Sequence, residues 1–70
     1  TTTNRELFAF INSNSEIEIS GKVNEMTVYS IDGKIIYTGE QKKVHVDVCG
    51  MYVVLSKTKM RYDYFKVIKN

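Results

Sequence analysis

The chain has 70 residues, a formal net charge of +2 at pH 7 and 43% hydrophobic residues. Such a length makes one domain, near the lower limit of chains that fold without metals or disulfides. The apolar content excludes a disordered chain, and the mixed charge excludes a general nucleic-acid-binding surface. The basic character is concentrated near the end, where cations outnumber a single acid: Lys57, Lys59, Arg61, Lys66 and Lys69 against Asp63.

The beginning of the chain carries little pattern. Residues 1–6 are polar and show no periodicity, so we expect the remnant of a linker there. The chain starts at Thr1 without an initiator Met or a signal peptide, which is typical of a piece of a longer protein. No apolar run approaches membrane length, so we expect no membrane-spanning segment. Cys49 is the sole cysteine, cannot form an internal disulfide and indicates no compartment.

Short apolar or alternating stretches, separated by turn residues, predict strands in the first half of the chain. The first is 7–11, which a turn cluster of Asn and Ser separates from the alternating stretch 16–20. Two further strands are predicted over 26–31 and 35–37. Between them lies Asp32-Gly33, and an Asp-Gly pair between strand formers predicts a tight hairpin in which both central residues have positive φ.

The most strongly patterned stretch begins at Val44. Valines at alternate positions over 44–48 predict a strand with one buried face. Gly50 interrupts this run, and the apolar stretch 51–55 predicts a strand that is apolar on both faces. Residues 61–68 are expected to return as the last strand of a terminal hairpin.

The count of short strands, with no helical spacing over a useful length, predicts an all-β fold. We expect residues 7–70 to form a single small immunoglobulin-like β-sandwich of about seven antiparallel strands. A two-layer sandwich covers only one face of each sheet, so the second apolar face of 51–55 needs a cover. We expect it from segment 7–11 or from another protein; in the second case the isolated domain forms a symmetric homodimer.

No catalytic or metal site is predicted. His45 is the only histidine and Cys49 the only thiol, and a strand that bends at Gly50 gives a Cys-His pair neither an orienting partner nor oxyanion donors. One His and one Cys cannot close a tetrahedral metal site. We therefore expect a solvent-facing His45, a half-buried Cys49 and a protein that is not an enzyme and has no cofactor.

Three tyrosines of the terminal hairpin have the same parity, which predicts that Tyr52, Tyr62 and Tyr64 line one face. Interleaved with cations, they are similar to a platform for single-stranded nucleic acid, but the charge density is too low and we expect no nucleic-acid partner. Core packing with hydroxyl groups at the rim is the prediction. A protein-binding surface is the alternative.

Three motifs occur in a recognisable order. Residues 28–34 read valine-tyrosine, three further residues and glycine-lysine; Gly50-x-Tyr52 is followed by Val53 and Val54; and the chain ends in a lysine-bearing strand. This order and spacing resemble the type A C-terminal sorting domain of the type IX (Por) secretion system. The resemblance covers roughly residues 16–70.

The resemblance implies a secretion and sorting signal. Proteins with such a domain reach the periplasm through an upstream signal peptide and cross the outer membrane of Bacteroidota-type bacteria. A sortase then usually removes the domain and attaches the cargo to the cell surface. The implied partners are the translocon, the sortase and the upstream cargo domain. The residues expected to matter are Gly33 and Gly50 for shape, Tyr52 and Val54 for packing, and Lys66, Val67 and Lys69 for recognition.

A second hypothesis is a permanently retained adhesion or scaffold module that docks on a neighbouring domain, a protein or a surface glycan. Val48 and Cys49 occupy positions where the resembled family usually has proline and a small residue. This departure and the two-sided apolar strand over 51–55 favour retention.

Overall fold

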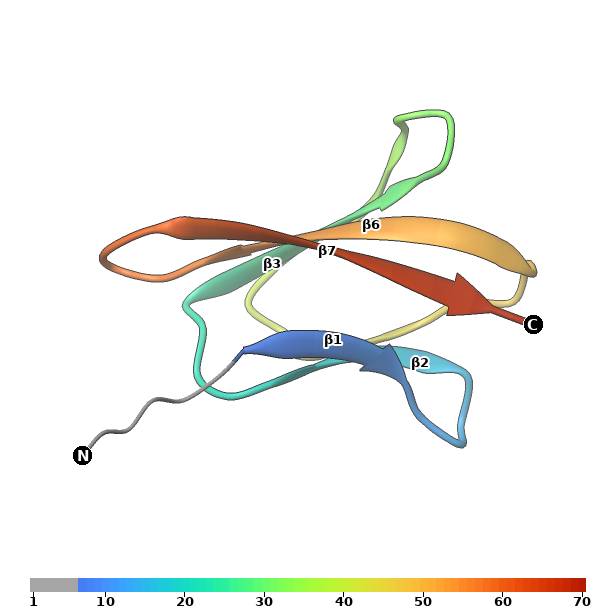
Figure 1. Cartoon of the computed structure of the whole chain (residues 1–70), viewed down its shortest axis with the longest axis horizontal. Helices are drawn as coiled ribbons and strands as arrows, with labels where there is room; N and C mark the ends of the chain where they lie inside the picture. The colour runs from blue at the N-terminus through green and yellow to red at the C-terminus, as the bar shows by residue number, and fades with distance from the viewer. Residues whose placement is uncertain (1–6) are drawn as a thin grey trace.

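The computed structural model describes residues 7–70 as seven antiparallel strands in two sheets, which confirms the predicted all-β sandwich (Figure 1). The predicted linker, 1–6, lies outside the described residues. The strands are β1 (Phe8–Ile11), β2 (Glu16–Ser20), β3 (Glu25–Ser30), β4 (Ile35–Gly39), β5 (Lys43–His45), β6 (Gly50–Lys57) and β7 (Tyr62–Lys69).

One sheet has three strands in the order β1-β2-β5, and the other has four in the order β4-β3-β6-β7. The fourth strand pairs with β3, whereas constant-type immunoglobulin domains keep it in the opposite sheet. The two longest strands, β6 and β7, pair along their whole length, from Gly50 opposite Lys69 to Lys57 opposite Tyr62. The tip of the β3–β4 hairpin projects from the body of the domain (Figure 1).

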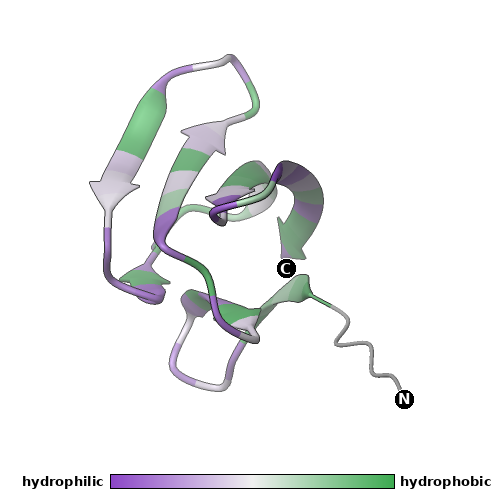
Figure 2. Cartoon of the chain, turned by 90° about the vertical axis from the view of Figure 1, so that its left-hand side faces the viewer, coloured by the Kyte–Doolittle hydropathy of each residue, from purple (hydrophilic) through white to green (hydrophobic). Residues whose placement is uncertain are grey.

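The core forms because alternate residues of each strand point toward the other sheet. Figure 2 shows the resulting alternation of apolar and polar residues along the ribbon. Each large apolar side chain removed from water contributes about 1.5–3 kcal/mol, so a small set of residues holds the two layers together. The buried residues are Ile17, Ile19, Met26, Val28, Val44, Val46, Tyr52, Val54 and Val67.

The N-terminal strand does not cover the outer side of β6. β1 pairs with β2 in the three-stranded sheet, with Ala9 opposite Ile19 and Ile11 opposite Ile17. Ala9 and Ile11 pack against the core from that side. The prediction that segment 7–11 covers the second face of 51–55 is therefore wrong, because a short hairpin ties this segment to β2.

The strand predicted over 44–48 is shorter than expected, because β5 ends at His45. Val44 and Val46 are buried as predicted, but Val48 is 72% exposed. The Val46 amide donates to the Ser15 carbonyl at 3.0 Å. Beyond this point the chain must leave the three-stranded sheet to reach β6 in the other layer, so the alternation no longer determines burial.

Two hairpin turns share one pattern of backbone hydrogen bonds. The Ser15 amide donates to the Asn12 carbonyl, as the Gly33 amide donates to the Ser30 carbonyl. The third loop residue has a left-handed backbone in both turns, with φ of 61° at Ser15 and 90° at Gly33. This is a type I turn followed by one left-handed residue.

The Asp32-Gly33 hairpin therefore differs from the one predicted. Gly33 has a positive φ and Asp32 does not, so the expectation of two left-handed residues is wrong for Asp32. The loop is one residue longer than a two-residue turn. The register shift between Val28 and Tyr29 in the pairing of β3 with β4 is a further irregularity that twists this hairpin.

We expect Ser15→Gly to raise the free energy of unfolding by up to about 1 kcal/mol, and Gly33→Ser to lower it by about 1 kcal/mol. The physical reason is that a left-handed conformation costs a residue with a Cβ about 1–2 kcal/mol, partly offset by the greater chain entropy of glycine. Denaturant unfolding of both variants measures the effect. Ser13→Gly in the same loop is the control and should be slightly destabilising; a loss of stability in Ser15→Gly would contradict the prediction.

Candidate functional site

The two internal motifs lie side by side at the centre of the four-stranded sheet. The first, 28–34, covers the end of β3 and its turn, and the second, 50–54, is the beginning of β6. Because β3 and β6 run antiparallel, the β3–β4 turn and the start of β6 lie at the same end of the sheet. The paired residues are Val28 and Val54, Tyr29 and Val53, and Ser30 and Tyr52.

Gly50 and Tyr52 together fix the entry into β6. Gly50 has a φ of 140°, and a Cβ added there would meet no atom within 4 Å. Its role is therefore the backbone conformation and not a close approach. Tyr52 is buried, and its hydroxyl donates to the Val48 carbonyl, which ties the loop before Gly50 to the core. The spacing of glycine and tyrosine thus has a structural reason. Gly50 allows the chain to bend, and the Tyr52 hydrogen bond to Val48 stabilises the bend.

We expect Gly50→Val to lower the free energy of unfolding by about 1–3 kcal/mol, the range for a side chain in an unfavourable backbone region. Thermal unfolding measures the change. Cys49→Val places the same side chain on the exposed neighbouring residue, whose φ is not positive, and should leave the melting temperature nearly unchanged. Equal melting temperatures for Gly50→Val and the unsubstituted chain would show that the bend is ordinary strand backbone.

We expect Tyr52→Phe to lower the free energy of unfolding by about 1 kcal/mol, because it keeps the buried ring and removes the hydrogen bond to the Val48 carbonyl. Tyr64→Phe removes a hydroxyl from an exposed ring and is the matched control, with no expected change. Chemical denaturation of the two variants provides the comparison. A Tyr52→Phe variant as stable as the control would mean that water replaces the lost bond.

The remaining residues named for packing and recognition differ widely in exposure. Val54 and Val67 are buried in the core, and Val67 lies opposite Tyr52. Lys66 is exposed on the outer side of β7, whereas Lys69 is half-buried at the end of the strand. A partner can therefore contact Lys66 directly, while Val67 acts through the packing that keeps β7 in place.

The three tyrosines of the terminal hairpin do not share a face. In the antiparallel pairing of β6 and β7, an even-numbered residue of one strand lies opposite an odd-numbered residue of the other. Tyr52 consequently points into the core, whereas Tyr62 and Tyr64 are exposed on the opposite side. The predictions of one tyrosine face and of core packing are wrong for Tyr62 and Tyr64. The Lys57 ammonium lies 5.9 Å from the centre of the Tyr62 ring.

The outward-pointing residues of β4, β3, β6 and β7 form a surface that we call the outer face. The central row on β6 is apolar: Val53 and Leu55 are half-buried, and Ile35 and Ile68 on the edge strands are 60% and 61% exposed. Glu25 lies opposite Lys57 in the sheet register at one end, and Lys66 lies opposite Val53 on the edge strand β7. The residues of the outer face are Glu25, Thr27, Tyr29, Ile35, Thr38, Met51, Val53, Leu55, Lys57, Tyr62, Tyr64, Lys66 and Ile68.

The cations near the end of the chain are distributed along the terminal hairpin and do not form one cluster. Lys57, Lys59 and Arg61 lie at the β6–β7 turn, and Lys69 lies at the other end of β7. The Arg61 Nε donates to Asp63 Oδ2 at 2.9 Å, which neutralises part of the charge at the turn. Lys66 stands between these ends.

His45 and Cys49 are both exposed. The His45 Nε2 lies 2.7 Å from Asp47 Oδ1, so its partner is a carboxylate two residues along the chain. Cys49 was expected to be half-buried and is not, because the chain has left the sheet after Val46. Within residues 7–70, the structure contains neither a cluster of three or more His, Cys, Asp and Glu suited to a metal nor a helix able to cross a membrane.

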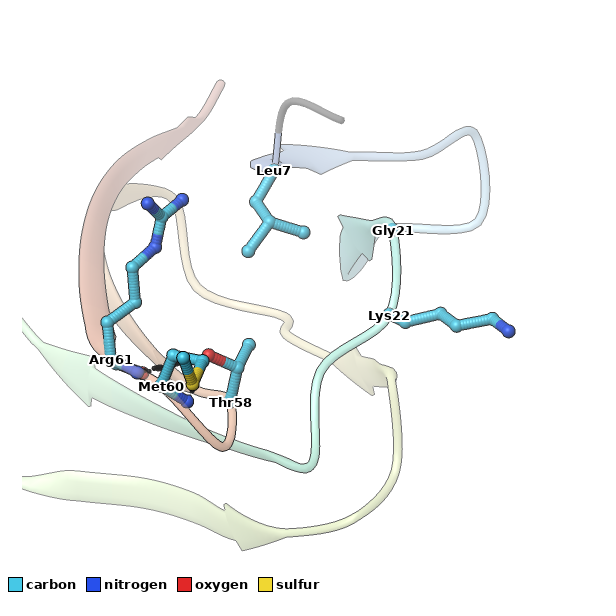
Figure 3. A pocket seen from close by; sticks show the side chains of 6 residues that line it. All are labelled: Leu7, Gly21, Lys22, Thr58, Met60 and Arg61. Carbon is cyan, nitrogen blue, oxygen red and sulfur yellow. Dashed lines mark hydrogen bonds between the residues drawn. The ribbon is translucent and has the colours of Figure 1, made fainter. Parts of the chain in front are cut away.

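A cavity of about 520 Å³ opens at the end of the sandwich where β1 begins near the β6–β7 turn (Figure 3). The Lys22 side chain points away from it (Figure 3). The Thr58 hydroxyl accepts a hydrogen bond from the Arg61 amide at 3.2 Å, so it serves the turn. Sequence reasoning did not find this cavity, because its lining comes from two separate loops and from Leu7, just before β1. The lining residues are Leu7, Gly21, Lys22, Thr58, Met60 and Arg61.

Comparison of the chain with known protein families, with curated proteins and with solved structures found no match.

Proposed function

We propose that this chain is a sorting domain, read as a folded signal by a secretion machinery of the type IX kind, which carries an upstream cargo across the outer membrane to the cell surface. The observation that supports this most is the pairing of β3 with β6, which places motifs 28–34 and 50–54 against each other. Stretches that read as separate motifs in the sequence form one structural unit at one end of the sheet.

The terminal strand lies beside this unit, next to β6, and a receptor can reach its exposed side chains. β7 is an edge strand of the four-stranded sheet, and it presents the exposed Lys66 and, at its end, the half-buried Lys69. Charged side chains at an interface rim mainly set the rate and the specificity of association. The translocon and the sortase are therefore expected to recognise the positions and charges of Lys66 and Lys69 on β7. The core residues on the inner side of β7 keep this strand in place.

The test fuses the chain behind a periplasm-directed reporter in a bacterium that has the secretion system. We expect the double substitution Lys66→Glu and Lys69→Glu to reduce delivery of the reporter to the surface about tenfold or more, because like-charge contacts at an interface cost several kcal/mol. The matched control reverses Lys42 and Lys43, two exposed lysines in and beside β5 of the other sheet. Surface labelling of intact cells measures delivery.

Thermal unfolding of the purified domains must accompany this test, because Lys69 is half-buried and its reversal could destabilise β7. Removal of residues 67–70 is a less informative change, since it also deletes the buried Val67. A folded double variant that is exported as well as the control would show that recognition does not depend on these lysines.

A second candidate function is a retained adhesion or scaffold module, which the apolar outer face favours. A domain that is cut off during export has no lasting use for an exposed apolar surface, whereas a docking module requires one. Mass spectrometry of the mature surface protein distinguishes the two. Peptides from residues 7–70 that remain linked to the cargo support retention, and their absence from the surface fraction supports cleavage.

A further inference from the structure

The outer face is apolar in its middle, and within residues 7–70 no other element packs on it, because β1 lies in the opposite sheet. Tyr64 is 70% exposed and Ile68 is 61% exposed, and they flank the central row of Met51, Val53 and Leu55. Side chains of this size lose about 1.5–3 kcal/mol each when they stay in water instead of being buried. Such a surface is typical of an interface.

We propose that the outer face is the interface between two copies of this chain, related by a two-fold axis that runs parallel to the strands between β3 and β6. A face-to-face contact needs an axis in the plane of the interface, and this axis places β3 of one copy over β6 of the other. Likewise, β4 of one copy lies over β7 of the other.

Charge complementarity supports this axis. Glu25 and Lys57 occupy paired positions on β3 and β6, at the same level of the sheet. Exchange of the two strands puts Glu25 of one copy opposite Lys57 of the second copy, and the reverse contact forms at the same time. The only carboxylate of the outer face thus meets a cation twice in one symmetric dimer.

The other in-plane axis, perpendicular to the strands, gives a poorer match. It would turn one end of the outer face onto the opposite end, so that Lys57 faces Met51 of the second copy. Glu25 would likewise lose its cation. Burial of an unpaired charge against apolar groups is unfavourable. The axis parallel to the strands pairs both Glu25 and Lys57 and leaves only Lys66, on the edge strand β7, at the level of the apolar Ile35, so it is preferred.

The size of the outer face predicts a reversible dimer. With a strand spacing of about 4.8 Å and a rise of about 3.3 Å per residue, four strands of the length of β6 span a flat area of roughly 500 Å². Two copies then bury about 1,000 Å², the range of weak and transient protein–protein interfaces. Two sheets stacked in this way also form a normal aligned packing, about 10 Å apart.

The first test is sedimentation of the purified chain over micromolar to millimolar concentrations. We expect a monomer–dimer equilibrium that Val53→Lys shifts toward monomer by at least about tenfold, because it places a charge in the middle of the apolar surface. Val48→Lys is the matched control, since Val48 is exposed but lies outside the outer face. A strict monomer, or a dimer that Val53→Lys leaves intact, would overturn the proposal.

The second test fixes the geometry and does not depend on Val53. Glu25→Lys and Lys57→Glu should each weaken the homodimer about tenfold or more, because like charges then face each other across the axis. A mixture of the two variants should form a heterodimer, in which opposite charges meet again between the copies. The pair within each chain remains like-charged in the mixture, so a purely intramolecular effect would not be rescued, and failure of the mixture to associate would overturn this axis.

Lys66 belongs both to the outer face and to the surface proposed for the secretion machinery, so a dimer and a receptor would compete for it. The two tests still give separate answers, because Val53, Glu25 and Lys57 are not among the residues proposed for sorting. A chain that dimerises but does not direct export would leave the interface standing, and the reverse outcome would leave the sorting function standing.

Discussion

The fold depends on strand β6, which is paired on both sides over most of its length. β3 lies along one edge of β6 from Lys57 to Tyr52, and β7 lies along the other edge from Lys57 to Gly50. Both neighbours satisfy the backbone groups of β6, so this strand can be apolar on both faces without exposing its polar backbone. Every element of the four-stranded sheet is positioned directly or through β3 by this pairing.

The two faces of β6 differ in burial. Tyr52, Val54 and Ser56 point inward, and these positions meet the three-stranded sheet. The Ser56 hydroxyl is buried without a hydrogen-bond partner among the described residues, which costs about 1–3 kcal/mol in a core with few members. The outward row of Met51, Val53 and Leu55 is not covered by another element of residues 7–70. The domain therefore forgoes the stabilisation that burial of these side chains would give. Association would bury that surface and stabilise the fold by mass action.

The alternation of apolar and polar residues with a period of two was sufficient to predict where most of the strands lie along the chain. The alternation of Ile17 and Ile19 with glutamates, and the apolar run that follows Gly50, gave strand positions that the structure confirms for β2 and β6. Prediction failed where the outcome depends on which strands become neighbours. The faces of Tyr62 and Tyr64 follow from the register of β7 against β6, and the place of β1 follows from its pairing with β2. Neither register is encoded in the period of a single strand.

In the candidate site, too, some features follow from neighbouring residues in the sequence, and others follow only from which strands pair. The left-handed φ of Gly33 and the bend at Gly50 are local needs, and a glycine between strand formers indicates them directly. The outer face, in contrast, combines residues from four strands, and its charge pattern requires Glu25 and Lys57 to meet across β3 and β6. A surface of this kind becomes visible only when the sheet order is known. For a small β-sandwich with few chemically reactive groups, recognition must therefore be sought in the surfaces that strand pairing assembles, and the outer face is an apolar surface that this pairing leaves uncovered in residues 7–70.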